Sequence, residues 1–172
     1  GLKKIVKTTS KLVPTMVVLY LLMGGWVVVD NITQIPYVLK TIIFSAFDFK
    51  TMYVGGFWGL VLLGIRRAVF SNESGIGNAP MYHGQSQTKN PINEGLVASL
   101  GPLLDTILVC SITGIVIIIS GSYLDTELNG ILLTLESFNR LFYGLGDIFL
   151  VFMVVVFGIT TLFTYSYYGV KC

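Results

Sequence analysis

Residues 148–170 read IFLVFMVVVFGITTLFTYSYYGV and contain no charged side chain. About 20 consecutive apolar residues in helical conformation cross the roughly 30 Å hydrocarbon core of a bilayer. A helix satisfies its backbone hydrogen bonds within the segment, which is why apolar spans of this length are helical in lipid. This stretch therefore predicts a transmembrane helix.

The composition of the whole chain also indicates a membrane protein. Among its 172 residues, 53% are hydrophobic and only 12% are charged, and the mean hydropathy is +0.78. A soluble domain carries about 25% charged residues, so the composition excludes a soluble globular protein. The net charge of +2, without basic stretches interleaved with aromatic residues, argues against a nucleic-acid partner. The lipid bilayer is the expected environment.

The apolar stretches predict an all-α fold, a polytopic bundle of transmembrane helices in one domain. We expect spans at about residues 12–30, 53–88, 93–120 and 146–169, the second of them broken near residues 70–80. Residues 32–47 carry apolar side chains at mixed three- and four-residue steps, which predicts an amphipathic helix at the membrane interface. The acidic segment between the last two spans is expected to be a loop.

Lysine and arginine residues in short loops predict the orientation of the spans. Four lysines lie at or before the start of the first span: Lys3, Lys4, Lys7 and Lys11. We expect this segment to be cytoplasmic, together with the loop around Lys89 and the end of the chain at Lys171. Because the chain opens without methionine and stops directly behind an apolar run, we expect an internal piece of a longer protein.

The second apolar stretch runs directly into a polar one, FSNESGIGNAP at residues 70–80. Glycine and proline disfavour a helix interior by about 1 and about 3 kcal/mol relative to alanine. Non-helical backbone at membrane depth survives only inside protein or beside a water-filled cavity, and many transporters build binding sites from such discontinuous helices. Carbonyls ending the first half would face a cation, and N–H groups starting the second half would face a carboxylate. Glu73 would pair with a substrate ammonium or with Arg66 or Arg67.

A simpler interpretation treats this polar stretch as a cytoplasmic loop. The apolar stretch before it is about 28 Å long at helical rise, which is already close to a full span. Arg66 and Arg67 would then lie at the inner interface. Gly55 and Gly56 favour the broken helix instead, because a membrane helix that starts at Phe57 ends near mid-depth.

Three regions of the sequence resemble the alanine/glycine:cation symporter family. Residues 67–80, RAVFSNESGIGNAP, are similar to the family stretch RGxFSNEAGxGSAP. Residues 95–106, which include GLV and LGPLLDT, resemble the seventh helix of that family. Residues 160–169, TTLFTYSYYG, are similar to TTILGWSYYG on its eighth helix. The regions follow the family order and cover nearly the whole chain.

The resemblance implies a LeuT-type inverted-repeat transporter with one discontinuous helix, of which this chain forms the fifth through eighth core helices. It implies sodium-coupled symport of a small neutral amino acid, alanine or glycine, by alternating access across a bacterial or archaeal cell membrane. The N-terminal half of the same transporter, which contributes much of the binding site, would lie outside this chain. Na⁺ enters as a co-transported ion, and no bound cofactor is expected.

The broken helix and the eighth-helix motif supply the expected site residues. The expected substrate-binding residues are Phe70, Ser71, Asn72, Glu73, Gly75, Gly77 and Tyr165. The resemblance implies that Thr160 and Thr161 bind sodium, a hard cation that prefers oxygen ligands; without it, both hydroxyls would be expected to bond their own helix backbone. Tyr165 replaces the family tryptophan and Thr164 the preceding glycine, which polarises a pocket wall and leaves the exact substrate open.

Asp105, Arg66 and Arg67 are the candidates for gating or coupling. A carboxylate near the middle of a span costs roughly 2.5–3.5 kcal/mol on insertion scales, so Asp105 should face a cavity or a partner. A hydrogen bond to neighbouring backbone is the structural alternative. His83 has no ligand spacing typical of a metal site and is expected to be a satisfied polar residue, and Cys110 is expected to be buried as a small hydrophobe.

Two rival functions deserve comparison with transport. A membrane-embedded enzyme could use Glu73, Asp105 and His83, but these residues are scattered over different depths and lack a catalytic spacing such as HExxH. An inactive truncated membrane fragment is the other alternative. The sequence favours a transporter over an enzyme.

Overall fold

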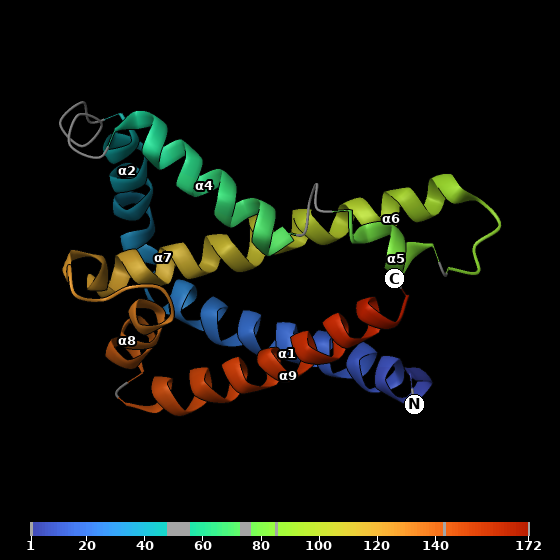
Figure 1. Ribbon diagram of the computed structural model, residues 1–172. Helices are drawn as coiled ribbons and strands as arrows, with labels where there is room; N and C mark the ends of the chain where they lie inside the picture. The colour runs from blue at the N-terminus through green and yellow to red at the C-terminus, as the bar shows by residue number, and fades with distance from the viewer. Residues whose placement is uncertain (1, 48–55, 73–76, 85, 143, 172) are drawn as a thin grey trace. The chain divides into compact units, whose positions relative to one another are not determined.

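The computed structural model describes residues 2–47, 56–72, 77–84, 86–142 and 144–171 (Figure 1). Its α-helices are α1 (Leu2–Asp30), α2 (Ile35–Ala46), α4 (Phe57–Asn72), α5 (Ala79–His83), α6 (Pro91–Leu104), α7 (Ser111–Ser120), α8 (Ile131–Leu141) and α9 (Leu145–Lys171). Short 3-10 helices cover Ile32–Gln34 (η1) and Ser122–Leu124 (η3), and a π-helical segment, η2, covers Asp105–Cys110 between α6 and α7. The described residues contain no strand, which confirms the all-α prediction for them.

Three helical stretches among the described residues are long and apolar enough to cross a membrane: Lys11–Asp30, Pro91–Ser120 and Leu145–Gly169. Their large apolar side chains lie largely on the outside, and Trp26 and Ile148 are 67% and 72% exposed. A soluble protein rarely exposes a continuous apolar surface of this size. The chain is therefore a polytopic helical membrane protein.

The chain divides into two compact units. The first comprises residues 1–35 and 109–172, with α1, α7, α8 and α9, and the second comprises residues 36–108, with α4, α5, α6 and nearly all of α2. One boundary between the units follows Ile35, and the other falls within the π segment η2.

The core of the first unit joins helices that are distant in sequence. α1 packs against α7 and α9, and α8 packs against the same two helices (Figure 1). The buried centre takes one residue from each of these four helices: Val27, Val116, Phe138 and Leu150. The fully buried Phe138 ring lies 6.0 Å from the ring of Tyr20 and 6.2 Å from that of Phe142, measured between centroids. This aromatic cluster fixes α8 against α1.

The expected loop between residues 124 and 147 contains the helix α8. Its exposed face carries an i,i+4 ion pair in which Arg140 Nε donates to Glu136 Oε1 at 2.7 Å. Gly130 and Gly144 flank the helix with φ of +56° and +90°, a region that favours glycine. The loop expectation was wrong because the helix has 11 residues, too few to span a membrane, and its charges resemble those of a loop.

Candidate binding site

The polar motif interrupts the helix that precedes it. α4 ends at Asn72, with Phe70 and Ser71 in its last turn, and α5 begins at Ala79. Gly77 has φ of +87°, which strains any other residue. Pro80 is the second residue of α5, where its missing N–H costs no helical hydrogen bond. The expected site residues Glu73 and Gly75 lie outside the described residues.

Asn72 connects the end of α4 to the π segment. Its Nδ2 donates to Thr106 Oγ1 at 2.8 Å, across 34 residues of sequence and within the second unit. The structure thus brings together the FSNE motif and the LGPLLDT motif, two regions that carry the family resemblance. Asn72 was expected in the site, whereas Thr106 was overlooked. Its position next to Asp105, at the end of the LGPLLDT motif, was the available signal.

Asp105 opens the π segment η2 and is partly buried. Pro102, three residues earlier, lies inside α6 and has no N–H to donate. The Asp105 N–H is shared between the carbonyls of Gly101 and Pro102, so the hydrogen-bond ladder is already irregular where the π turn begins. Single π turns inside α-helices are frequent at functional sites. A role of the Asp105 carboxylate in coupling or gating stays a prediction.

Arg66 and Arg67 lie on α4 and are exposed in the second unit. Within the described part of the chain, neither guanidinium forms an ion pair. Their expected partner Glu73 lies outside it. The gating assignment of both residues stays a prediction.

Thr160 and Thr161 direct their hydroxyls at one backbone oxygen. Each Oγ1 donates to the Phe157 carbonyl at 2.8 Å. This is the backbone-bonded arrangement expected in the absence of a family resemblance. This arrangement places three oxygen atoms, the two hydroxyl oxygens and the Phe157 carbonyl oxygen, on one turn of α9. Both hydroxyl protons point to the carbonyl. The hydroxyl lone pairs consequently point away from that oxygen, where a cation could approach them.

The site residues of α9 occupy different faces of the helix. Thr160 is 4% exposed and lies seven residues from both Met153 and Tyr167, which are also buried, so these three side chains share the packed face. Tyr165 is 49% exposed and follows Thr161 by one helical turn. Its ring meets Tyr168 edge-on at 5.8 Å. Tyr165 and Thr160 therefore do not line a common surface within the first unit.

Three hydrogen-bond donors converge on Glu94 near the start of α6. His83 Nδ1 and Ser86 Oγ each lie 2.6 Å from a Glu94 carboxylate oxygen, and Thr88 Oγ1 donates at 3.3 Å. The network fastens the end of α5 to α6 across a short loop, which Asn90 closes by capping α6 through the Ile92 N–H at 3.1 Å. His83 is thus a satisfied polar residue, as expected.

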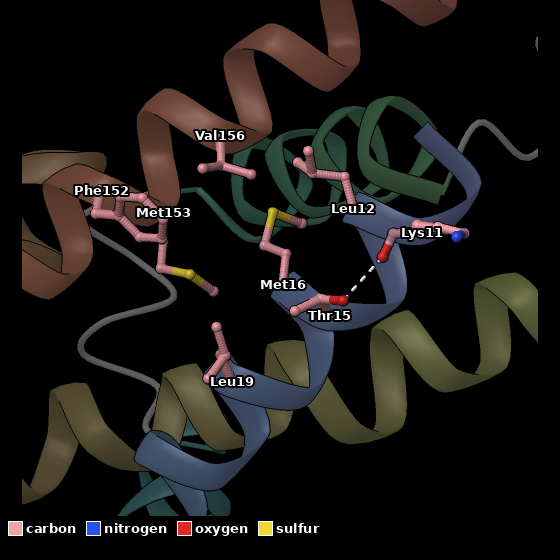
Figure 2. Close-up of a pocket in the computed structure, with 8 residues that line it drawn as sticks. All are labelled: Lys11, Leu12, Thr15, Met16, Leu19, Phe152, Met153 and Val156. Atoms are coloured by element: carbon pink, nitrogen blue, oxygen red, sulfur yellow. Dashed lines mark hydrogen bonds between the residues drawn. The ribbon is translucent and has the colours of Figure 1, made fainter. Parts of the chain in front are cut away.

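An apolar groove of about 560 Å³ lies between α1 and α9 in the first unit (Figure 2). Its lining consists of Lys11, Leu12, Thr15, Met16, Leu19, Phe152, Met153 and Val156. The Thr15 hydroxyl donates to the Lys11 carbonyl at 2.9 Å, and the Lys11 amino group points away from the apolar side chains (Figure 2). The lining offers no carboxylate, so it does not match the ammonium group of an amino acid.

Cys110 corrects one expectation from the sequence. Its side chain is exposed rather than buried. Periodicity could not place it, because the π turn shifts the faces of the helix on either side of residues 105–110 by about one residue.

The three helical stretches of membrane length among the described residues define a polytopic helical membrane protein. The sequence of the whole chain narrows this class. The chain belongs to the sodium:alanine symporter family, which matches residues 1–172. This family consists of transporters and not of enzymes, so the membrane-embedded enzyme is not supported.

Curated relatives cover the chain almost completely. An uncharacterized transporter of Haemophilus influenzae is 36% identical over 178 residues, which are 100% of this chain and 39% of the relative. The sodium/alanine symporter AgcS of Methanococcus maripaludis is 38% identical over 100% of this chain and 38% of its own length. The probable sodium/glutamine symporter GlnT of Bacillus subtilis is 35% identical over 98% of this chain and 35% of its own length. The chain therefore spans between a third and two fifths of the length of these relatives.

Proposed function

We propose that the protein is a sodium-coupled symporter that carries a small neutral amino acid, alanine or glycine, across the cell membrane of a bacterium or archaeon. The observation that carries this proposal is the family match over residues 1–172. The helices of membrane length support it, as does the end of α4 inside the polar motif. A LeuT-type inverted repeat is the architecture we propose for the complete transporter.

The end of α4 is suited to a positively charged group. The last carbonyls of a helix have no partner within it and carry a partial negative charge, which favours a cation within the last turn. Phe70, Ser71 and Asn72 form that turn. We assign the substrate ammonium or the cation to this end, and Glu73, Gly75 and Gly77 are further proposed substrate-binding residues. Tyr165 on α9 is proposed as a substrate-binding residue on the family resemblance alone.

The hydroxyls of Thr160 and Thr161 are the proposed sodium ligands. Both oxygens lie on one turn, and their protons are already committed to the Phe157 carbonyl. Coupling then follows from linkage: if bound sodium raises the affinity for the amino acid by some factor, the amino acid raises the affinity for sodium by the same factor. Asp105, Arg66 and Arg67 would act on gating or coupling.

Glutamine is the second candidate substrate. One relative is named as a probable sodium/glutamine symporter, and another as a sodium/alanine symporter. The polar Tyr165 and Thr164 favour a more polar pocket wall than the family tryptophan and glycine provide. A competition experiment separates the two substrates directly.

The test is uptake of labelled alanine by the full-length protein in proteoliposomes, with an inward sodium gradient or a matched potassium gradient. We expect strong stimulation by sodium, inhibition by unlabelled alanine or glycine, and weaker inhibition by glutamine. Uptake that is equal in potassium would overturn sodium coupling. Stronger inhibition by glutamine than by alanine would instead select the second candidate.

The sodium assignment has its own variant and control. Thr160→Val keeps the side-chain shape but removes the oxygen, and losing a hydrogen-bonding group to a charge costs about 1.5–3 kcal/mol, so half-saturation by sodium should rise by roughly ten-fold or more. Ser166→Ala is the matched control, because Ser166 also bonds its own helix, at 2.7 Å to the Leu162 carbonyl, but is exposed. Equal sodium dependence in the two variants would remove Thr160 from the site.

A further inference from the structure

The hydrogen bond between Asn72 and Thr106 joins the last residue of α4 to the second residue of the π segment. Both residues belong to the second unit. His83, which follows α4 along the chain, is connected to α6 near its start through Glu94. The Asn72 bond is a separate connection, near the other end of α6.

In the structure, the Asn72 amide directs its nitrogen at Thr106. The amide is planar and carries its nitrogen and oxygen on the same carbon, so a nitrogen directed at Thr106 turns the oxygen away from Thr106. An amide oxygen is a strong hydrogen-bond acceptor and can receive an ammonium donor. With the nitrogen bonded to Thr106, the amide oxygen is the end that faces away from Thr106.

Thr106 lies at the start of the π turn. A π-helical turn contains one residue more than an α-helical turn, so it rotates the following side chains relative to the preceding ones by about 100°. Asp105 and Thr106 begin this turn three and four residues after Pro102. Single π turns of this kind are frequent at functional sites.

We propose that Thr106 is a positioning residue for amino-acid binding: its hydroxyl holds the Asn72 amide so that the amide oxygen accepts a hydrogen bond from the substrate ammonium. This inference rests on the proposed transport function and deepens it. Thr106 itself does not touch the substrate. It acts on the Michaelis constant for the amino acid by orienting a residue that does.

The transport test compares Thr106→Val, Thr106→Ser and Ser99→Ala in the full-length protein. Valine preserves the shape and removes the acceptor, serine restores the hydroxyl, and Ser99 provides a control on the same helix because its hydroxyl donates to the Leu96 carbonyl at 2.8 Å. We expect Thr106→Val to raise KM for alanine by five- to ten-fold, with little change in the maximal rate per transporter molecule. Thr106→Ser and Ser99→Ala should retain a KM near that of the unmodified protein.

A double-mutant cycle separates positioning from general damage. In an Asn72→Ala background, Thr106→Val should have no further effect on KM, because the group that it positions is already absent. Independent, multiplicative effects of the two substitutions would overturn the proposal. An unchanged KM for Thr106→Val with a lower maximal rate would also overturn it, since that result indicates a structural role.

A stability measurement distinguishes failure of this inference from failure of the proposed function. The same cycle is measured as the thermal unfolding temperature of the purified protein without substrate. Non-additive shifts would demonstrate the hydrogen bond between Asn72 and Thr106. If the unmodified protein nevertheless transported no alanine with sodium, the substrate role of that bond would be overturned, but its existence would not. Additive shifts would overturn the bond itself.

Discussion

Gly146 lies where the start of α9 meets the end of α8. A β-carbon on Gly146 would overlap the Phe138 carbonyl carbon and lie 2.5 Å from its oxygen and 2.7 Å from the Asn139 nitrogen. All three atoms belong to the backbone, so no side-chain rotation relieves the overlap. Replacing Gly146 by alanine must therefore move α8 and α9 apart.

The cost of that movement can be estimated from the packing around Phe138. Ordinary contact with a β-carbon begins at 3.4 Å, so the Phe138 oxygen must retreat by about 0.9 Å. The same shift separates Phe138 from Leu150, which are 0% and 3% exposed in the core. Overpacking of this kind costs about 1–3 kcal/mol. The gain from replacing a helical glycine is at most about 1 kcal/mol and is smallest in a first turn, so a net loss of about 2 kcal/mol remains.

The assay is thermal unfolding of the purified full-length protein in detergent, compared at one heating rate because membrane proteins often unfold irreversibly. Gly146→Ala should lower the apparent unfolding temperature by several degrees. Gly158→Ala is the matched control on the same helix, since among the described residues no heavy atom outside its chain neighbours and the adjoining helix backbone lies within 4 Å of its β-carbon position. This control should unfold at the original temperature or slightly above it.

Equal unfolding temperatures for Gly146→Ala and Gly158→Ala would refute the reasoning. Such a result would mean that α8 and the start of α9 are not in backbone contact. A loss in Gly158→Ala alone would point instead to a contact made by that face of α9 outside the first unit.

Two further predictions test hydrogen bonds in the two units. Glu94→Gln removes the carboxylate charge that accepts hydrogen bonds from His83 and Ser86 at 2.6 Å. Trypsin should therefore cleave after Lys89 several-fold faster in opened membranes. The control Glu127→Gln, at an exposed residue, should leave the cleavage rate unaltered. Tyr20→Phe removes the hydroxyl that donates to Thr113 Oγ1, whose own proton goes to the Val109 carbonyl at 2.7 Å. Losing this hydrogen bond should cost about 1 kcal/mol of stability and lower the unfolding temperature by a few degrees. The control Tyr37→Phe, at a residue that is 65% exposed, should not change the unfolding temperature.

Much of the fold class follows from local features of the sequence. Uninterrupted apolar runs such as residues 148–170 predict helices of membrane length because each residue in lipid must be apolar and internally hydrogen-bonded. The glycines and the proline of residues 70–80 likewise account for the end of α4 at Asn72, since they disfavour a continuing helix. The family resemblance, carried by contiguous motifs, was equally available without coordinates.

Local features could not supply the rest. α8 was taken for a loop because an 11-residue amphipathic helix becomes identifiable only through what it packs against, here Phe138 in the core. Cys110 was expected to be buried because the π turn that changes its face leaves no periodic signal. The expected roles of Asp105, Arg66 and Arg67 stay predictions for the same reason: a role in gating depends on partners that periodicity does not reveal.

The sequence by itself determined that this is a helical membrane protein of the sodium:alanine symporter family, through its apolar stretches and its contiguous motifs. These are properties of neighbouring residues. Only the tertiary structure decided that Asn72 meets Thr106, that Thr160 lies on the packed face of α9 while Tyr165 does not, and that Gly146 has no room for a methyl group where Gly158 does. Each of these facts depends on how helix faces that are distant in sequence approach one another. Two residues of the same type can therefore have different surroundings.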